Sequence, residues 1–154
     1  MKKVNTNNFK KTLSKFSTGI TVVCVKNNNS IYGKTVNSFN SLSLNPPMVL
    51  FSLGNYSSSI KKFSKTKFLS INILSSKQKK LSDNFALTEP NLEDIKFIEG
   101  KNKTVIIPNC IANLECELME KIKRGDHIIF VCKILELQSN DKLKPLVYFN
   151  SKYF

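Results

Sequence analysis

The chain has 154 residues, of which 41% are hydrophobic, and it carries a formal net charge of +13. This length suits one compact domain, residues 1–154, and leaves too little chain for two. No apolar run reaches the roughly 18 residues that span a membrane, and no apolar signal-peptide segment follows the lysine-rich start. We therefore expect a soluble cytoplasmic protein.

The positive charge raises the alternative of a basic β-barrel that binds nucleic acid, since clustered cations neutralise phosphates. Only Arg124 is an arginine, however, and the lysines are scattered along the chain. Recognition of base edges and phosphates favours the bidentate guanidinium over the lysine ammonium. We therefore interpret the charge as a solvated basic surface and predict no nucleic-acid partner.

The chain begins with a predicted helix and continues with strands. Residues 6–18 space Phe9, Leu13 and Phe16 along one helical face, and Gly19 follows as a stop signal. Six later segments are apolar or alternate in the manner of strands: 20–25, 31–36, 47–53, 68–74, 112–119 and 127–137. The nearly continuous apolar run of 47–53 predicts a central strand, and the alternation of 112–119 predicts a half-buried one.

The remaining segments connect these strands. Residues 57–63 and 76–86 suit short helices, whereas 88–108 have few periodic signals and are expected to form a long loop or lid. The chain ends in the aromatic run PLVYFNSKYF. Six strands with a few short helices, and no regular alternation of strand and helix, predict a mainly β fold: an antiparallel barrel or sandwich.

Cysteine and histidine usage predicts no metal site. Cys24, Cys110, Cys116 and Cys132 lie far apart or on apolar runs without a CxxC pair, so buried reduced thiols are expected. The one histidine, His127, excludes multi-histidine sites.

Several catalytic motifs are absent. The five glycines form neither a GxGxxG nor a P-loop pattern, and there is no GxSxG elbow. Asp126 and His127 are adjacent, and adjacent side chains on an extended chain point to opposite faces, which excludes the geometry of a Ser-His-Asp triad.

Small polar residues gather before the paired prolines of the segment GKTVNSFNSLSLNPPMVLFSL, residues 33–53. Either this is an ordinary polar turn, or Thr35, Asn37 and Ser38 face a ligand. A flavin ring has a polar edge on a flat apolar body, so its site needs short donors and acceptors beside aliphatic surface. The serines at 57–59, before a predicted helix, are candidates for holding a phosphate.

The same residues resemble the flavin reductase-like proteins of the FMN-binding split-barrel fold, small NAD(P)H-dependent reductases that supply reduced flavin to two-component monooxygenases. The matching stretches are FSTGITVVC at 16–24, the segment at 33–53, FLSINIL at 68–74, GDHIIFVCKI at 125–134 and PLVYFNSKYF at 145–154, in family order.

The resemblance implies a six-stranded antiparallel split barrel that forms a homodimer, with FMN or FAD near the subunit interface. It also implies the residues that contact the flavin: Lys34, Thr35, Val36, Asn37, Ser38, Phe51, Ser52 and Leu53 along the ring, Ser57, Ser58 and Ser59 toward the phosphate, and Phe85 closing the pocket. His127 would face the nicotinamide, with Tyr148 near the same entrance. Lys34 would place a cation at the flavin edge, or point to solvent.

The implied activity is an NAD(P)H:flavin oxidoreductase that transfers hydride from a nicotinamide dinucleotide to FMN or FAD, with an oxygenase as a possible partner. Hydride transfer demands alignment and no protein nucleophile, so His127 is expected to position the nicotinamide or a flavin. The alternative is an electron carrier of the same fold that holds flavin without nicotinamide turnover.

Overall fold

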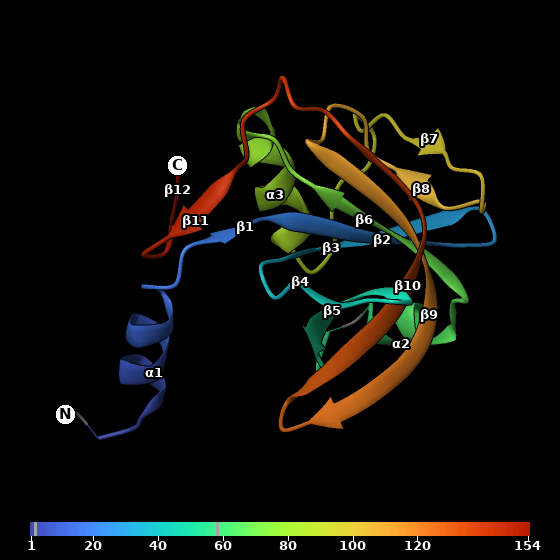
Figure 1. Cartoon of the computed structure of the whole chain (residues 1–154). Coiled ribbons are helices and arrows are strands. Elements are labelled where there is room, and N and C mark those ends of the chain that lie inside the picture. The colour runs from blue at the N-terminus through green and yellow to red at the C-terminus, as the bar shows by residue number, and fades with distance from the viewer. Residues whose placement is uncertain (2, 58) are drawn as a thin grey trace.

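The computed structural model describes residues 1, 3–57 and 59–154. Its body is a curled, antiparallel, seven-stranded sheet with the strand order β3-β2-β6-β9-β10-β5-β4 (Figure 1). The bounds of these strands are β2 Thr21–Asn27, β3 Ser30–Val36, β4 Asn40–Leu44, β5 Pro47–Gly54, β6 Phe68–Ile73, β9 Ala112–Arg124 and β10 His127–Ser139. Two small sheets accompany it, made of β1 Thr18–Gly19, β11 Val147–Phe149 and β12 Lys152–Tyr153, and of β7 Ile98–Glu99 and β8 Val105–Ile106.

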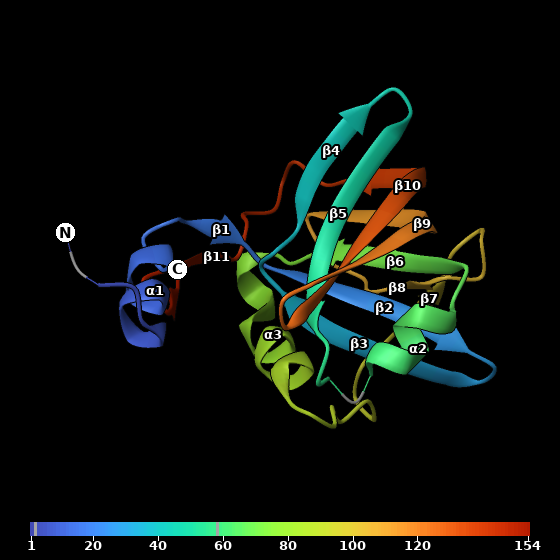
Figure 2. The same cartoon turned by 90° about the horizontal axis from the view of Figure 1, so that it is seen from below.

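The six strands expected from the sequence are six consecutive neighbours in this sheet, so the mainly β antiparallel prediction is confirmed. The seventh, β4, was not predicted and pairs with the free edge of β5. The strand expected at 47–53 is an interior one, because β5 pairs with β10 on one side and with β4 on the other, but it lies next to the end of the sheet and not at its centre. Figure 2 shows the β4–β5 hairpin extending beyond the rest of the barrel.

The core has one hydrophobic cluster on each face of β2. Val23 and Val25 join the cluster that contains Phe51, while Val22 and Cys24 join the cluster that contains Phe85. Both faces of this strand are therefore buried, which explains its apolar run, β-branched except at Cys24. In the first cluster the rings of Phe51 and Phe130 are stacked, with centroids 5.0 Å apart.

The expectation that 112–119 are half-buried is wrong for its first half. Residues 113–116 are all buried, because the segment from Ile98 to Ile107 covers the outer face of β9. The carboxylate of Glu115 accepts hydrogen bonds from the backbone amides of Lys101 (3.0 Å) and Asn102 (2.9 Å). The second half of the predicted loop 88–108 is thus tied to the sheet and contains the β7–β8 hairpin.

Three helical segments lie against the sheet: α2 Ile60–Lys65, the 3-10 turn η1 Ser76–Gln78, and α3 Lys79–Ala86. They match the helices predicted at 57–63 and 76–86 to within a few residues. Among the described helices, none has the length and apolarity that crossing a membrane requires.

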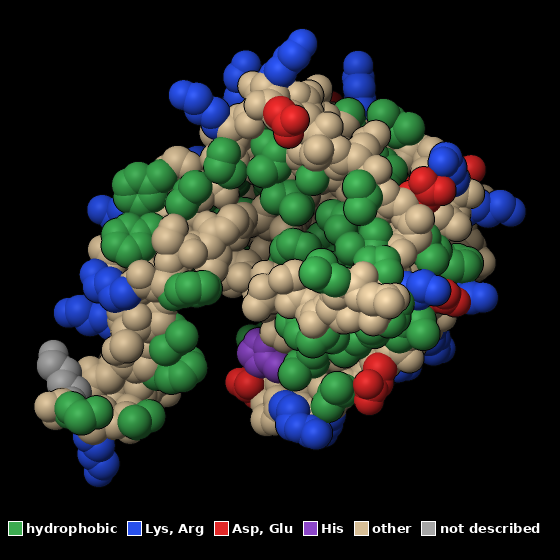
Figure 3. Space-filling view, viewed as in Figure 1, with side chains coloured by type: hydrophobic (Ala, Val, Ile, Leu, Met, Phe, Trp, Pro, Cys, Tyr) green, Lys and Arg blue, Asp and Glu red, His purple; other side chains and the backbone are tan. Residues whose placement is uncertain are grey.

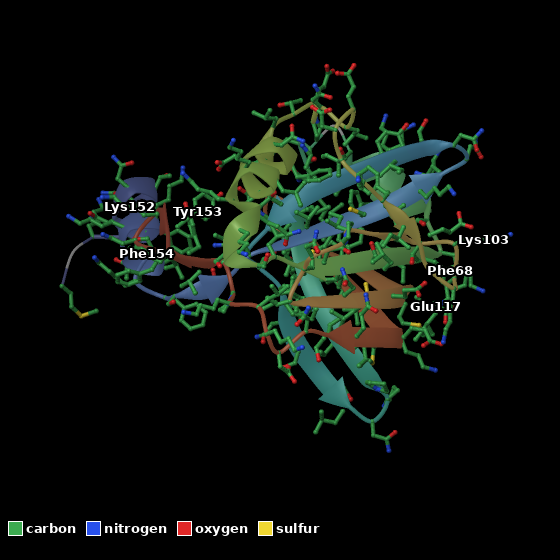
Figure 4. The ribbon with its side chains drawn as sticks, turned by 90° about the horizontal axis from the view of Figure 1, so that it is seen from above. Phe68, Lys103, Glu117, Lys152, Tyr153 and Phe154 are labelled. Atoms are coloured by element: carbon green, nitrogen blue, oxygen red, sulfur yellow. The ribbon has the colours of Figure 1, made fainter. Side chains whose placement is uncertain are left out.

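Helix α1, Thr6–Leu13, stands apart from the barrel beside the C-terminal strands (Figure 1). It is shorter than the predicted 6–18, because the chain turns toward the C-terminal hairpin, where the Asn150 amide donates to the Ser14 carbonyl at 2.8 Å. Figure 4 shows Lys152, Tyr153 and Phe154 at this end of the molecule, and Phe68, Lys103 and Glu117 at the opposite end.

Candidate functional site

A cavity of about 370 Å³ opens where the ends of β3 and β5 meet the start of β10. Four parts of the chain line it: the end of β3 and the residues after it, the end of β5 and its following turn, the end of α3 and the residues after it, and the first residue of β10. The lining residues are Lys34, Thr35, Val36, Asn37, Ser38, Ser52, Leu53, Gly54, Tyr56, Ser57, Ala86, Thr88 and His127. We call this the first cavity.

Two side chains of β3 fasten this strand to the segment around α3. The Thr35 hydroxyl donates to the Ser82 carbonyl at 2.7 Å. The Lys34 ammonium donates to the Leu87 carbonyl at 2.5 Å and lies 3.4 Å from the Thr88 carbonyl. Partial burial lowers the pKa of Lys34. The ammonium therefore lies against the chain that follows α3 and not in open solvent.

Ser38 continues the β-ladder at the point where β4 has not yet begun. Since Asn40 pairs with Leu50, the ladder extended by two positions would match residue 38 with Ser52. Ser38 Oγ replaces the missing strand, because it donates to the Ser52 carbonyl and accepts from the Ser52 amide, both at 3.0 Å. This hydroxyl holds the wall of the cavity, whereas the neighbouring Asn37 is exposed.

The turn after β5 leaves a polar group for a ligand. Ser57 Oγ is buried and has no hydrogen-bond partner among the described residues. A buried hydroxyl without a partner is costly, so its presence on a cavity wall points to a bound group. Gly54, which pairs with His127 in the sheet, lies against the Tyr56 ring.

His127 and Asp126 form a pair at the mouth of the cavity. His127 Nδ1 lies 2.7 Å from Asp126 Oδ1, and this contact lowers the pKa of Asp126. The expectation that these two side chains point to opposite faces is wrong. Gly125 adopts a left-handed conformation with φ of +54°, so Asp126 lies in a turn and not on an extended strand.

Comparison with known proteins identifies the family and the fold. Residues 13–154 match the family model described as the flavin reductase like domain. The chain belongs to the flavin reductase-like family. FMN reductase (NADH) SmoA of Agrobacterium fabrum is 34% identical over 137 residues, 89% of this chain and 79% of the relative.

Two further family members cover nearly the whole chain. The reductase component of 4-hydroxyphenylacetate 3-monooxygenase from Thermus thermophilus is 31% identical over 145 residues, 94% of this chain and 93% of its own length. The solved structure of flavin reductase PheA2 in its native state has a TM-score of 0.91 at 33% identity, and covers 98% of this chain and 97% of its own. The barrel is therefore the split barrel of the flavin reductase family.

Nine of the residues that the resemblance singled out lie together in the first cavity: Lys34, Thr35, Val36, Asn37, Ser38, Ser52, Leu53, Ser57 and His127. Ser59 lines a neighbouring cavity, and Ser58 lies outside the described residues. The other three are elsewhere. Phe51 and Phe85 are fully buried in the two core clusters, and Tyr148 packs against Tyr153 with ring centroids 5.3 Å apart.

The sequence analysis missed Gly54, Tyr56, Ala86 and Thr88, which also line the first cavity. They adjoin predicted positions on the chain, but no periodic or motif signal distinguishes them. Phe85 affects the site indirectly, since its ring fills the space where Gly33 lacks a side chain.

The four cysteines are buried and free, as the sequence predicts. Burial raises the pKa of Cys110 to about 11 and that of Cys132 to about 12. Burial also raises the pKa values of Cys24 and Cys116, so all four thiols are protonated at neutral pH. In the described part of the chain, no group of three or more His, Cys, Asp or Glu side chains is placed to hold a metal ion.

Proposed function

We propose that this protein is an NAD(P)H:flavin oxidoreductase whose flavin binds in the first cavity. The observation that carries the proposal is the Ser57 hydroxyl, buried at the cavity wall with no partner among the described residues. Membership of the flavin reductase-like family supports it, as do relatives named as an FMN reductase (NADH) and as a monooxygenase reductase component.

The residues present fit a flavin. The lining combines aliphatic surface from Val36 and Leu53 with short polar groups from Asn37 and Ser57. Such a mixture suits a flat apolar ring with a polar edge. Thr35 and Ser38 contribute indirectly to the site, because their hydroxyls form hydrogen bonds to the backbone that hold β3 and β5 in place.

A flavin held here would supply the redox chemistry, since its ring can accept a hydride from a reduced nicotinamide. The protein would hold the two reactants in alignment. His127 lies at the mouth of the cavity with Asp126 fixing its ring through Nδ1, so its Nε2 edge is available to orient the nicotinamide. Lys34 adds a positive charge to the lining, which favours a ring that gains negative charge.

A homodimer and an oxygenase partner are part of this proposal. The N-terminal arm consists of α1 and the residues between it and β1. On this arm Phe9 is 58% exposed and Phe16 is 75% exposed, and Leu44 of β4 is 95% exposed. Figure 3 shows hydrophobic side chains on the side of this arm that faces the barrel. A second copy of the chain would bury such surface. Reduced flavin would then pass to a monooxygenase, the role that the Thermus relative's name describes.

The test is to mix the purified protein with NADH or NADPH and free FMN or FAD under air, and to follow absorbance at the nicotinamide band. Steady oxidation supports the oxidoreductase. A protein that retains flavin without turnover would instead be an electron carrier. Salt-sensitive binding of an oligonucleotide without flavin affinity would favour the nucleic-acid alternative. On the face of the molecule drawn in Figure 3, however, the Lys and Arg side chains are spread apart.

A further inference from the structure

A groove of about 600 Å³ runs along the outer side of α3. One of its walls carries residues of η1 and α3, and the other carries residues from 91–96 and 107–109. We call this the α3 groove. Among the described residues, none lines both this groove and the first cavity, and none lines both this groove and the neighbouring cavity that contains Ser59.

Helix α3 separates the groove from the first cavity. Leu81 and Asn84 line the groove, whereas Ser82 and Phe85 are buried on another face of the helix. The Ser82 carbonyl accepts the hydrogen bond from Thr35 of the first cavity at 2.7 Å. A molecule in the α3 groove would therefore leave the first cavity free.

Side-chain amides fix the two walls of the groove relative to each other. The Gln78 side chain donates to the Pro108 carbonyl at 2.9 Å. The Asn84 side chain donates to the Asn91 carbonyl at 2.7 Å and accepts from the Asn91 amide at 3.0 Å. The walls are thus joined at two places, so the groove is already formed without a ligand, which reduces the entropy cost of binding.

The floor of the groove is apolar. Leu81 and Ile95 are half-buried and pack against the core cluster that contains Phe85, and Ile107 belongs to that cluster. The lining is therefore continuous with the hydrophobic core. An apolar floor of this kind suits the apolar body of a small molecule.

Cations surround this floor. Lys77, Lys80 and Lys96 line the groove, against a single carboxylate, Asp94, among its described lining residues. None of the three ammonium groups forms an ion pair with another residue in the described part of the chain. An ammonium group is a hydrogen-bond donor with a full charge, so the groove is complementary to an anion.

We propose that the α3 groove is a second binding site, for a small organic carboxylate with an apolar body. Such a ligand places its body on the floor and its charge at the lysines. Inorganic phosphate would use the lysines alone, and an apolar side chain of another protein would use the floor alone. The proposal goes beyond the flavin site and does not depend on it.

The experiment is a nuclear magnetic resonance titration of the ¹⁵N-labelled full chain with octanoate, and with octanamide and inorganic phosphate for comparison. Octanoate is expected to cause saturable shifts of the Leu81, Ile95 and Ile107 amides, with and without added FMN. It is expected to bind at least about fivefold more tightly than octanamide, which has the same chain length and lacks the charge.

A double variant tests the cations. Lys77→Gln combined with Lys80→Gln is expected to raise the Kd for octanoate about three- to tenfold, the loss of two exposed charge contacts. The Kd for octanamide is expected to stay within about twofold. The matched control combines Lys79→Gln with Lys152→Gln, two exposed lysines outside the groove, and is expected to leave both values within about twofold.

The absence of shifts at the three groove amides would overturn the proposal. Equal affinities for octanoate and octanamide would also overturn it, since the groove would then be an apolar surface without anion recognition. Phosphate that binds at these amides as tightly as octanoate would assign the lysines to an inorganic anion. Octanoate shifts at Val36 and Leu53 that FMN abolishes, in place of shifts in the groove, would move the site to the first cavity.

Discussion

Ser38 and Ser52 are joined by two hydrogen bonds of 3.0 Å in which one hydroxyl serves both the amide and the carbonyl of the opposing residue. The hydroxyl thereby replaces a strand backbone at the end of the β4–β5 ladder. The residue that borders the cavity is thus also the residue that fixes its wall.

Ser38→Ala is expected to lower the free energy of unfolding by about 1–2 kcal/mol, because two half-buried backbone groups of Ser52 lose their partner. Flavin affinity is expected to fall as well, since the wall is no longer fixed. Urea unfolding and flavin titration measure the two effects. Ser41→Ala, an exposed serine of β4, is the control, and an equal loss of stability there would contradict the bridging role.

Gly33→Ala is expected to destabilise the protein by about 1–3 kcal/mol, the usual cost of overpacking a core. An added Cβ would collide with the Phe85 ring, which is fully buried and cannot swing aside. Gly19→Ala is the matched control, because nothing lies within 4 Å of a Cβ at that position. Thermal unfolding of both variants compares them, and a silent Gly33→Ala would show that α3 can move away from β3 at little cost.

Glu115→Gln is expected to lower the free energy of unfolding at pH 7 by about 1–3 kcal/mol, since its hydrogen bonds lose their charge. Burial alone would raise the pKa of Glu115, but the hydrogen bonds from Asn102, Thr104 and Lys101 outweigh it and hold the pKa below its usual value. A lowered folded pKa means that the stabilisation is present above the unfolded pKa, about 4.3, and is lost as the pH falls through the folded value.

The measurement for Glu115 is chemical unfolding of wild type and variant from pH 7 to pH 3. The stability difference between them is expected to be constant near neutrality and to shrink below about pH 4.3. Glu120→Gln, an exposed glutamate on the same strand, controls for the charge change. A difference that stays constant down to pH 3 would show that the charge of Glu115 is not what stabilises the loop.

His127→Ala is expected to raise the apparent KM for the nicotinamide about 3- to 10-fold, the equivalent of roughly one hydrogen bond. Flavin affinity is expected to change less, because His127 lies at the mouth of the cavity and 43% of its side chain is exposed. Steady-state kinetics and flavin titration separate the two effects. Equal changes in both would contradict the assignment of His127 to the nicotinamide alone.

The expected strands followed from local pattern, and the clearest case is β2. Its apolar run, β-branched except at Cys24, favours burial on both faces, and the two core clusters provide it. β4 could not be predicted in the same way, since four of its five residues are exposed and its strand conformation depends on pairing with β5. Likewise, Glu115 sits in an alternating pattern typical of a half-exposed strand, and only the packing of 98–107 buries it.

Within the site, the sequence determined which short polar groups meet, because Lys34 to Ser38 are consecutive and their place at the end of a strand fixes their neighbourhood. It did not determine which aromatic rings face the cavity. Phe51 is next to Ser52 on β5, so the two side chains point to opposite faces, and Phe51 packs in the core. Phe85 and Tyr148 are also directed by packing between elements far apart in the chain, a long-range property that no local pattern records. Local hydrogen-bonding chemistry is set residue by residue along the chain, whereas the direction of an apolar ring depends on what the finished fold leaves to bury it.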